Sequence, residues 1–364
     1  MKNISGQKIF QYGIFLFIIS LVTNHFVRDW YGPVPDKDIG FPLQLVWETK
    51  FSDNIKEVYI TENGNIIVQL GYSVNLISPK TGDLIWKFRI DEPISIATAY
   101  NGKIFVVSKN NVFALSESNG EIIWKNVFIS IGPPEFSYVD ASNFLTVKYG
   151  SINLYNTTNG EIENEYYSGR GQVKTCFLSG VFFTFMGQIE AFSFQDGESL
   201  WVEKSFHNPE EAVCKNEIAY FIENDSKLIA YDLKTRTKLW VKDFPVENPY
   251  TLERVFSVDG LLVVDGINNI FIISKVDGSV INTLSINGGL TGSNLISSVA
   301  AIENNLYFSE GFTQSIYSYD MTTWQQTGNL HLSFPTLTAT AVERFINIDD
   351  MLILWKNNRL FAYK

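Results

Sequence analysis

The side chains best suited to chemistry are few in this chain of 364 residues, and they do not cluster. The three histidines, His25, His207 and His331, lack the short spacing that joins two ligands on one element. The two cysteines, Cys176 and Cys214, are too few for a disulfide-rich scaffold and do not form a thiolate metal motif. The sequence therefore predicts no catalytic residue and no metal ligand.

The overall charge excludes one class of partner. The formal net charge is −11, and Lys and Arg do not occur in runs. Nucleic-acid binding needs clustered cations that neutralise phosphates, so no nucleic-acid partner is expected. Hydrophobic residues make up 45% of the chain and aromatic residues 15%, which is enough for a large packed core.

The elements that position any site come from one repeated unit, seen most clearly at Ala114–Trp124. Its Asn119–Gly120 pair predicts a type I′ hairpin turn between two short strands. The unit recurs roughly every 40 residues, a period typical of propellers and solenoids. The positions equivalent to Trp124 are Trp47, Trp86, Trp124, Asn164, Trp201, Trp240, Asn282 and Gly328. The corresponding turn positions are Gly82, Gly120, Gly160, Gly197, Arg236, Gly278 and Trp324.

Each period contains four short strand patterns and no helical one. In the period that ends at Trp124 the expected strands are 94–99, 103–108, 111–116 and 121–128. Three further strands follow the last full period, and a lone strand at 43–50 precedes the first. Pairing the lone strand with the last three removes an exposed sheet edge. We therefore predict an all-β, eight-bladed β-propeller of four-stranded blades, closed by its N- and C-terminal strands and preceded by one N-terminal transmembrane or signal helix.

The N-terminal segment predicts how the propeller is held. Lys2 and Lys8 precede an apolar run at 9–27, which is typical of a signal anchor or a secretory signal. No small-residue cleavage site follows the run, which favours an uncleaved anchor. The predicted domains are an anchor at 1–28, a Pro/Gly linker at 29–42 and a propeller at 43–364. The propeller is expected on the extracytoplasmic side of a cell membrane, which means periplasmic, extracellular or lumenal.

The motif Ala-x-Ser-x-x-Asn-Gly-x-x-x-Trp at 114–124, with copies at 191–201 and 230–240, resembles the tryptophan-docking repeat of quinoprotein-type (PQQ-like) β-propellers. A large aromatic at a fixed place in every period is also expected to be core. The resemblance implies that the tryptophans dock beside the glycine turns and hold adjacent blades together. The docking residues are then Trp47, Trp86, Trp124, Trp201, Trp240, Gly82, Gly120, Gly160, Gly197 and Gly278.

The PQQ-like family contains both enzymes and scaffolds. Its quinone-dependent dehydrogenases are longer, and many carry two adjacent cysteines beside the cofactor. Here Cys176 is followed by Phe177. The resemblance is therefore closer to the non-enzymatic scaffold of outer-membrane protein assembly, with no cofactor expected. Two alternatives are a PQQ-dependent dehydrogenase-like enzyme and a carbohydrate-binding propeller.

Binding is expected on the face formed by connections between consecutive blades, because loops on a rigid scaffold commonly carry function. Arg170, His207 and Glu211 are the candidate residues there. Arg170 is either a contact for an anionic ligand or an ordinary solvated loop residue. The expected partner is a protein or an extended polymer, bound by a monomeric propeller.

The two cysteines fall at nearly the same place in successive periods, before Trp201 and Trp240. That placement predicts that they lie on the innermost strands of adjacent blades. Burial as two free thiols is favoured over a disulfide, because free cysteine is among the most buried residue types.

Overall fold

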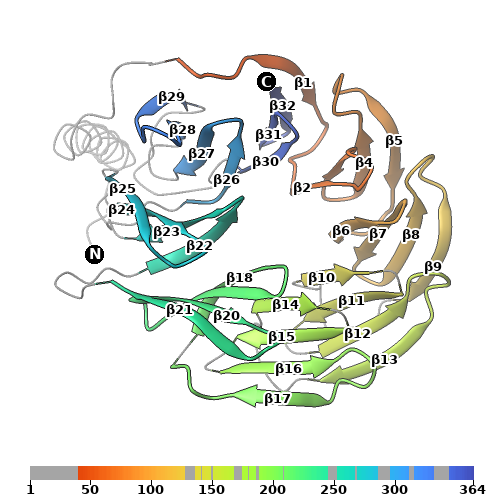
Figure 1. Ribbon diagram of the computed structural model, residues 1–364. Coiled ribbons are helices and arrows are strands. Elements are labelled where there is room, and N and C mark those ends of the chain that lie inside the picture. The colour runs from red at the N-terminus through yellow and green to blue at the C-terminus, as the bar shows by residue number, and fades with distance from the viewer. Residues whose placement is uncertain are drawn as a thin grey trace, which may run out of the picture.

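The chain folds into eight four-stranded antiparallel sheets arranged around a ring (Figure 1). The computed structural model describes residues 40–127, 136–140, 142–148, 151–167, 174–178, 180–185, 188–207, 209–244, 252–266, 269–285, 296–310, 315–331 and 344–364. The all-β, eight-bladed prediction is confirmed. The predicted N-terminal helix lies outside the described residues. Within the part described, no helix is long and apolar enough to cross a bilayer.

The blades follow chain order, and each has its first strand at the centre of the ring. Blades 1 to 4 consist of β2 (Glu57–Ile60), β3 (Ile66–Gln69), β4 (Ser73–Ile77) and β5 (Leu84–Arg89); β6 (Ile94–Tyr100), β7 (Lys103–Ser108), β8 (Asn111–Ser116) and β9 (Ile122–Val127); β10 (Phe136–Val139), β11 (Asn143–Lys148), β12 (Ser151–Asn156) and β13 (Ile162–Tyr167); and β14 (Lys174–Leu178), β15 (Val181–Phe185), β16 (Ile189–Ser193) and β17 (Ser199–Glu203).

Blades 5 to 7 continue the same order, and blade 8 is composite. Their strands are β18 (Pro209–Lys215), β19 (Ile218–Glu223), β20 (Lys227–Asp232) and β21 (Thr237–Asp243); β22 (Leu252–Val258), β23 (Leu261–Gly266), β24 (Asn269–Ser274) and β25 (Val280–Ser285); β26 (Val299–Ile302), β27 (Asn305–Glu310), β28 (Ser315–Asp320) and β29 (Gln326–His331); and β30 (Arg344–Ile348), β31 (Met351–Lys356) and β32 (Arg359–Tyr363) with β1 (Leu45–Lys50).

The ring closes as the sequence predicts, because β1 pairs antiparallel with β32. Leu45 lies opposite Tyr363 and Lys50 opposite Arg359. In Figure 1 these strands, which come from opposite ends of the chain, lie side by side at the top of the ring. Closure leaves no blade at a chain end with a missing strand.

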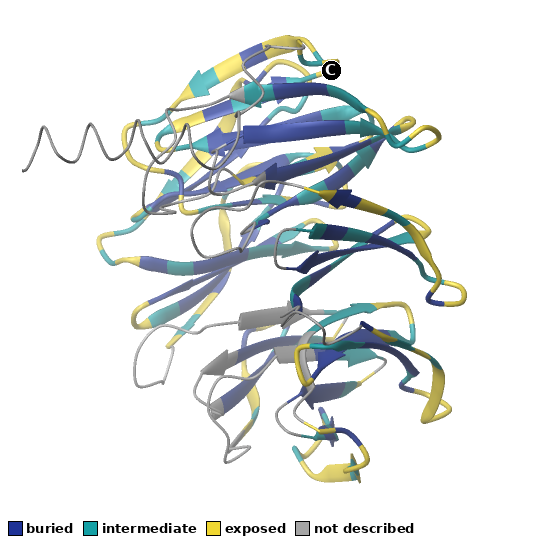
Figure 2. Ribbon diagram, turned by 90° about the vertical axis from the view of Figure 1, so that its left-hand side faces the viewer, coloured by how far each residue is buried: buried dark blue, intermediate teal, exposed yellow. Residues whose placement is uncertain are grey.

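The burial of each strand follows from its position in the blade. The two middle strands are covered on both faces by neighbouring blades, so β3 and β4 are buried at every residue. In the outer strands β5 and β9, Trp86 and Trp124 are buried and the residues on either side of each are exposed. Figure 2 shows buried residues along the middle of the strands and exposed residues mainly at the turns and outer edges. The hydrophobic clusters lie between blades: one of them joins Leu76 of blade 1 to Ile104 of blade 2.

The repeated turn differs from the predicted type I′ geometry. In the loop between β8 and β9 Gly120 has φ +73°, while Asn119 is not in the left-handed region. Gly120 N donates to Ser116 O at 2.8 Å, and a bulge follows Ala114 in the register of the two strands. The connection is therefore a longer loop with a left-handed glycine and a bulge, a common hairpin alternative. The bulge sets Ala114 directly opposite Trp124.

Candidate functional site

Four of the blade junctions share one docking contact between an outer-strand tryptophan and the next blade's turn. Trp47, Trp86, Trp124 and Trp240 each donate the indole Nε1–H to a backbone carbonyl in that turn, at 2.8, 2.7, 3.1 and 3.0 Å respectively. The accepting carbonyls belong to Pro79, Glu117, Thr157 and Lys275, in the same order.

The glycine in each turn makes room for the indole. At Gly120 a Cβ would lie 2.7 Å from Cδ2 of Trp86, and at Gly160 it would lie 2.3 Å from Cε3 of Trp124. Gly82 and Gly278 have equally close approaches to Trp47 and Trp240. A side chain at these positions would collide with the ring, so the glycine and the tryptophan act as one unit.

Two junctions use substitutes for the tryptophan. Asn164, between blades 3 and 4, donates its amide to Gln195 O at 2.9 Å, in the turn that contains Gly197. Between blades 6 and 7, Asn282 takes the strand position, and Trp324 in the turn packs on the cluster shared by these blades. Trp324 itself has φ +56°.

The junction between blades 4 and 5 departs furthest from this docking contact. Arg236 occupies the glycine position with φ +58°, and its guanidinium lies over the Trp201 ring, 4.9 Å from the ring centroid. Within the described residues, Trp201 Nε1 donates no hydrogen bond. The side chain of Arg236 prevents the close approach of the indole to the turn that glycine permits. A pocket lies beside the Trp201 ring.

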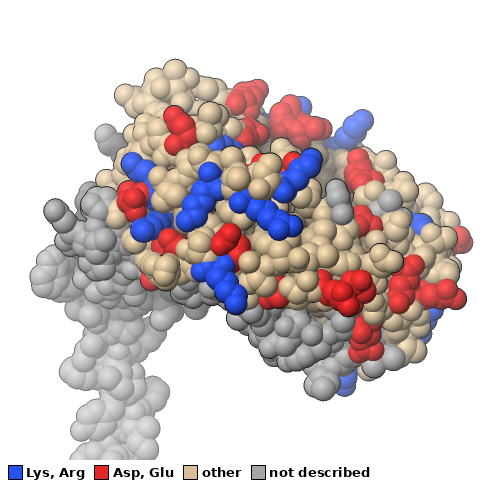
Figure 3. Space-filling view, turned by 60° about the horizontal axis from the view of Figure 1, so that its bottom comes forward, with Lys and Arg blue, Asp and Glu red and all other residues tan. Residues whose placement is uncertain are grey.

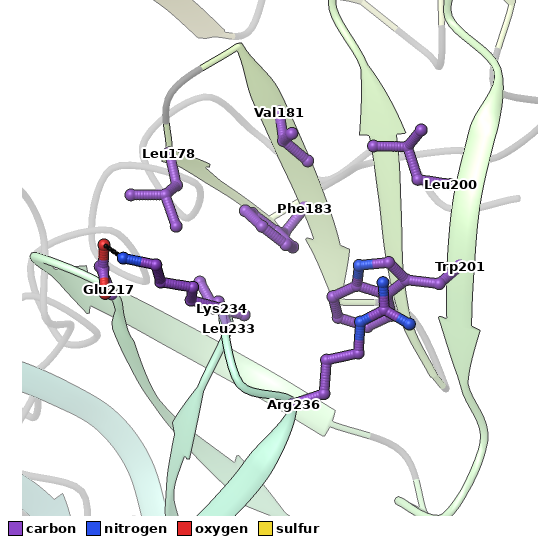
Figure 4. Close-up of a pocket in the computed structure, with 9 residues that line it drawn as sticks. All are labelled: Leu178, Val181, Phe183, Leu200, Trp201, Glu217, Leu233, Lys234 and Arg236. Carbon is purple, nitrogen blue, oxygen red and sulfur yellow. Dashed lines mark hydrogen bonds and ion pairs between the residues drawn. The ribbon is translucent and has the colours of Figure 1, made fainter.

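This pocket, of about 480 Å³, is mostly apolar. It is lined by Leu178, Val181, Phe183, Leu200, Trp201, Glu217, Leu233, Lys234 and Arg236 (Figure 4). The residues come from β14, β15 and β17 of blade 4 and from the β18–β19 and β20–β21 turns of blade 5. Lys234 Nζ lies 3.1 Å from Glu217 Oε1, and this pair is solvent-exposed.

A disulfide joins the inner strands of the same two blades. Cys176 on β14 is bonded to Cys214 on β18, with a Cα–Cα distance of 5.7 Å. The prediction of two free buried thiols is wrong. The placement on adjacent inner strands is confirmed, and it puts the two Cα atoms within the range that a disulfide spans. The inner edge of this junction is thus covalently fixed, while its outer edge lacks the tryptophan–glycine contact.

Of the residues predicted for the loop face, the structure describes the side chain of His207 and the backbone of Glu211. Arg170 lies outside the described residues. His207 follows β17 with its side chain 82% exposed, and its backbone N–H donates to the buried Glu223 carboxylate at 2.7 Å. Glu211 lies within β18 rather than in the preceding connection. In the part of the chain that the structure describes, no three His, Cys, Asp or Glu side chains gather as metal ligands.

The pocket and the predicted loop face lie at opposite ends of the strands. In an antiparallel blade the first-to-second and third-to-fourth turns share one end, and the connections between blades lie at the other. The pocket turns, β14–β15, β18–β19 and β20–β21, are all of the first kind. The repeat pattern alone does not reveal the pocket, although Arg236 in a glycine position is its signal in the sequence.

Eight blades and a recurring tryptophan–glycine contact define a β-propeller built from PQQ-like repeats. Residues 44–242 match the profile of the family described as outer membrane protein assembly factor BamB. This match covers more than half of the chain, so the chain belongs to that family. The resemblance inferred from the repeat, and its scaffold branch, are therefore confirmed.

Solved structures show the same fold at low identity. The crystal structure of BamB from Moraxella catarrhalis has a TM-score of 0.67 and 10% identity, covering 88% of this chain and 99% of the other. The computationally designed Ika8 protein has a TM-score of 0.66 and 11% identity, covering 86% and 97%. Sqt1 of Saccharomyces cerevisiae has a TM-score of 0.66 and 9% identity, covering 88% and 99%. No curated protein sequence matched the chain.

Proposed function

We propose that this protein is a membrane-tethered, non-catalytic propeller that binds protein partners on the extracytoplasmic side of a membrane. Membership of the BamB family carries the proposal, because that family is described by its part in outer membrane protein assembly. The cationic N-terminus and apolar run at 1–28 supply the proposed anchor. Eight blades closed into one ring suit a rigid platform that presents loops to other proteins.

The disulfide supports the proposed location. A bond between Cys176 and Cys214 forms and persists in an oxidising compartment and is rare in a reducing cytoplasm. A propeller exported by the N-terminal segment would meet such conditions. The location and the bond are thus mutually consistent.

Membrane tethering is tested with the full chain and a matched variant that lacks residues 1–28. The full chain is expected to remain with membranes after alkaline carbonate washing. It is also expected to be digested by protease that reaches the extracytoplasmic side of that membrane, in spheroplasts for a periplasmic propeller and in opened vesicles for a lumenal one. The truncated variant is expected to be released. Release of both forms by the wash, or protection of the propeller from protease on the extracytoplasmic side, contradicts the proposal.

Partner binding is tested by cross-linking the full chain in its native membrane and identifying the captured proteins. Recovery of defined membrane or exported proteins is expected. Turnover of an alcohol or a sugar after addition of PQQ and calcium, with no captured protein, contradicts the non-catalytic scaffold.

A further inference from the structure

The pocket between blades 4 and 5 combines an apolar cavity with an exposed cation, Arg236. Phe183, Leu178 and Val181 from blade 4 form one side of it (Figure 4). Arg236 is exposed and, among the described residues, forms no ion pair. Leu200, at the rim, is 52% exposed. An apolar group that enters the pocket therefore meets a guanidinium at its edge.

The β20–β21 side of the pocket is basic although the protein is acidic, and the acidic residue of the pocket lining, Glu217, is paired with Lys234. The segment 233–242 carries Lys234, Arg236, Lys238 and Lys242 and no acidic residue, in a chain with a net charge of −11. The edge of the ring that Figure 3 presents shows Lys and Arg side chains gathered in one area, with acidic groups mostly around it. Local positive potential of this kind attracts an anionic partner.

We infer that this pocket binds an acidic peptide segment of a partner protein, with an apolar side chain in the cavity and an adjacent carboxylate on Arg236. The inference rests on the proposed scaffold function and specifies where a partner is held. Charge complementarity selects the acidic segment, and the apolar lining selects a large side chain such as Phe or Leu beside the carboxylate.

The stacked guanidinium is well placed for this role. The guanidinium lies over the Trp201 ring, 4.9 Å from the ring centroid, and this contact restrains Arg236. The N–H groups of a guanidinium lie in its own plane, so contact through its face leaves them able to donate. A carboxylate can accept two parallel hydrogen bonds from that plane. At the docked junctions the tryptophan Nε1–H binds the next blade, as Trp86 does. The Nε1–H of Trp201 is instead a further donor beside the cavity (Figure 4).

The disulfide fits the same function. Cys176–Cys214 fixes blades 4 and 5 at their inner strands, so the outer edge stays open without separating the blades. A preformed pocket loses less conformational freedom when a peptide binds than one that must open first.

The test measures binding of a fluorescein-labelled peptide, Ser-Gly-Glu-Phe-Asp-Gly-Ser, to the full chain in detergent. Binding is detected as an increase in fluorescence anisotropy. One control peptide replaces both acids with Gln and Asn, and another replaces Phe with Ser. We expect saturable binding of the acidic aromatic peptide and at least tenfold weaker binding of each control. Rising salt concentration is expected to weaken binding.

The key variant is Arg236→Gly, which restores the glycine found at the four docked junctions. Trp201 is then expected to dock on the turn and close the pocket, so peptide binding falls at least tenfold while the unfolding midpoint stays the same or rises. Lys87→Ala removes an exposed cation on β5 of blade 1, outside the basic segment 233–242, and is expected to change affinity less than twofold. Equal binding by Arg236→Gly and the native chain overturns the inference, as does the absence of binding at millimolar peptide.

Two outcomes separate this inference from the proposed function. A photo-cross-linker at Leu200 is expected to capture a partner in native membranes, and Arg236→Gly is expected to abolish that capture. If cross-linkers at other positions of the propeller capture a partner and Arg236→Gly does not change that capture, the pocket is not the partner's binding site, but the scaffold function stands. If no cross-linker position captures a partner, the scaffold function is refuted as well.

Benzoate tests a small-molecule alternative. Binding of benzoate but of none of the peptides assigns the pocket to a small carboxylate instead and overturns the peptide assignment.

Discussion

At the residue scale, the docking contact depends on the absence of a single Cβ. Gly120 and Gly102 lie in the same blade with φ +73° and +69°. A Cβ at residue 120 would lie 2.7 Å from Trp86, whereas one at residue 102 would have no neighbour within 4 Å. The two positions therefore separate the backbone preference for glycine from the packing of the indole.

Gly102→Ala is expected to cost about 1–2 kcal/mol, the penalty for a left-handed alanine. Gly120→Ala adds a collision with Trp86 and is expected to cost about 2–5 kcal/mol, because forced overpacking adds about 1–3 kcal/mol. Chemical unfolding of the two variants measures the difference. Equal losses at both positions would show that the indole contact contributes nothing beyond backbone conformation.

Tyr231 offers a second residue-scale test. Its ring is buried between blades 4 and 5, and its hydroxyl has no hydrogen-bond partner among the described residues. Burial, helped by the nearby Glu203 carboxylate, raises the pKa of Tyr231 to about 12. The folded state therefore holds this proton more tightly than the unfolded state, whose pKa is near 10.

Because the folded pKa is the higher one, Tyr231 contributes its full stabilisation below about pH 10, and that contribution is lost between about pH 10 and 12. Tyr231→Phe is expected to leave stability at pH 7 unchanged or to raise it by about 1 kcal/mol, because it removes an unpaired buried hydroxyl. It should also make the alkaline decline in the unfolding midpoint less steep. A loss of more than about 2 kcal/mol at pH 7 would instead indicate a hydroxyl that is hydrogen-bonded.

At the scale of strands and turns, the sequence predicts what local signals determine and misses what strand pairing determines. The strands predicted at 103–108 and 111–116 coincide with the observed β7 and β8, because alternation and turn residues are local signals. The turn at Asn101–Gly102 has both residues at positive φ, as the Asn-Gly pair predicts, whereas Asn119–Gly120 does not. The bulge after Ala114 decides that difference, and it depends on strand pairing.

The pocket was missed for a related reason. Trp201 keeps the repeat residue, so the sequence groups it with Trp86 and Trp124, but its partner position carries Arg236. The consequence appears only where two blades meet in space. The disulfide was not predicted for the same reason, because the Cα–Cα distance of 5.7 Å between the two cysteines is a property of the assembled ring.

The disulfide is expected to stabilise the junction of blades 4 and 5. The two cysteines are 38 residues apart, and cross-links over such loops contribute about 2–4 kcal/mol. Dithiothreitol should therefore lower the unfolding midpoint of the native chain and not that of the Cys176→Ala, Cys214→Ala double variant. Peptide mapping without reductant should recover the two cysteine peptides joined. Two thiols that react with maleimide in the denatured, unreduced protein would contradict the bond.

At the scale of the whole molecule, a single strand holds the ring closed. β1 covers the edge of β32 and brings Trp47 onto Gly82 of blade 1, where Nε1 donates to Pro79 O at 2.8 Å. Thr49 Oγ1 adds a hydrogen bond to Gly82 O at 2.6 Å. The stability of blades far apart in sequence therefore depends on residues near the start of the propeller.

Two truncations test this closure. A chain that begins at Gly40 keeps β1 and the packing of Phe41 on Tyr307 and Tyr363, so its unfolding midpoint should equal that of the full chain. A chain that begins at Ser52 loses β1 and should be less stable by at least about 3–5 kcal/mol, the cost of deleting a buried tryptophan alone. Its open β32 edge should also promote concentration-dependent association.

A synthetic peptide spanning residues 43–51 supplies the control for misfolding. If the shortened chain is an open ring, the peptide should pair with β32, raise the unfolding midpoint and reverse the association, because an added strand satisfies the exposed edge. The same peptide with Trp47 replaced by Ala should be much less effective, since it pairs with β32 but cannot cover Gly82. Identical rescue by both peptides would assign closure to strand pairing alone, and a shortened chain as stable as the longer one would show that β1 does not hold the ring.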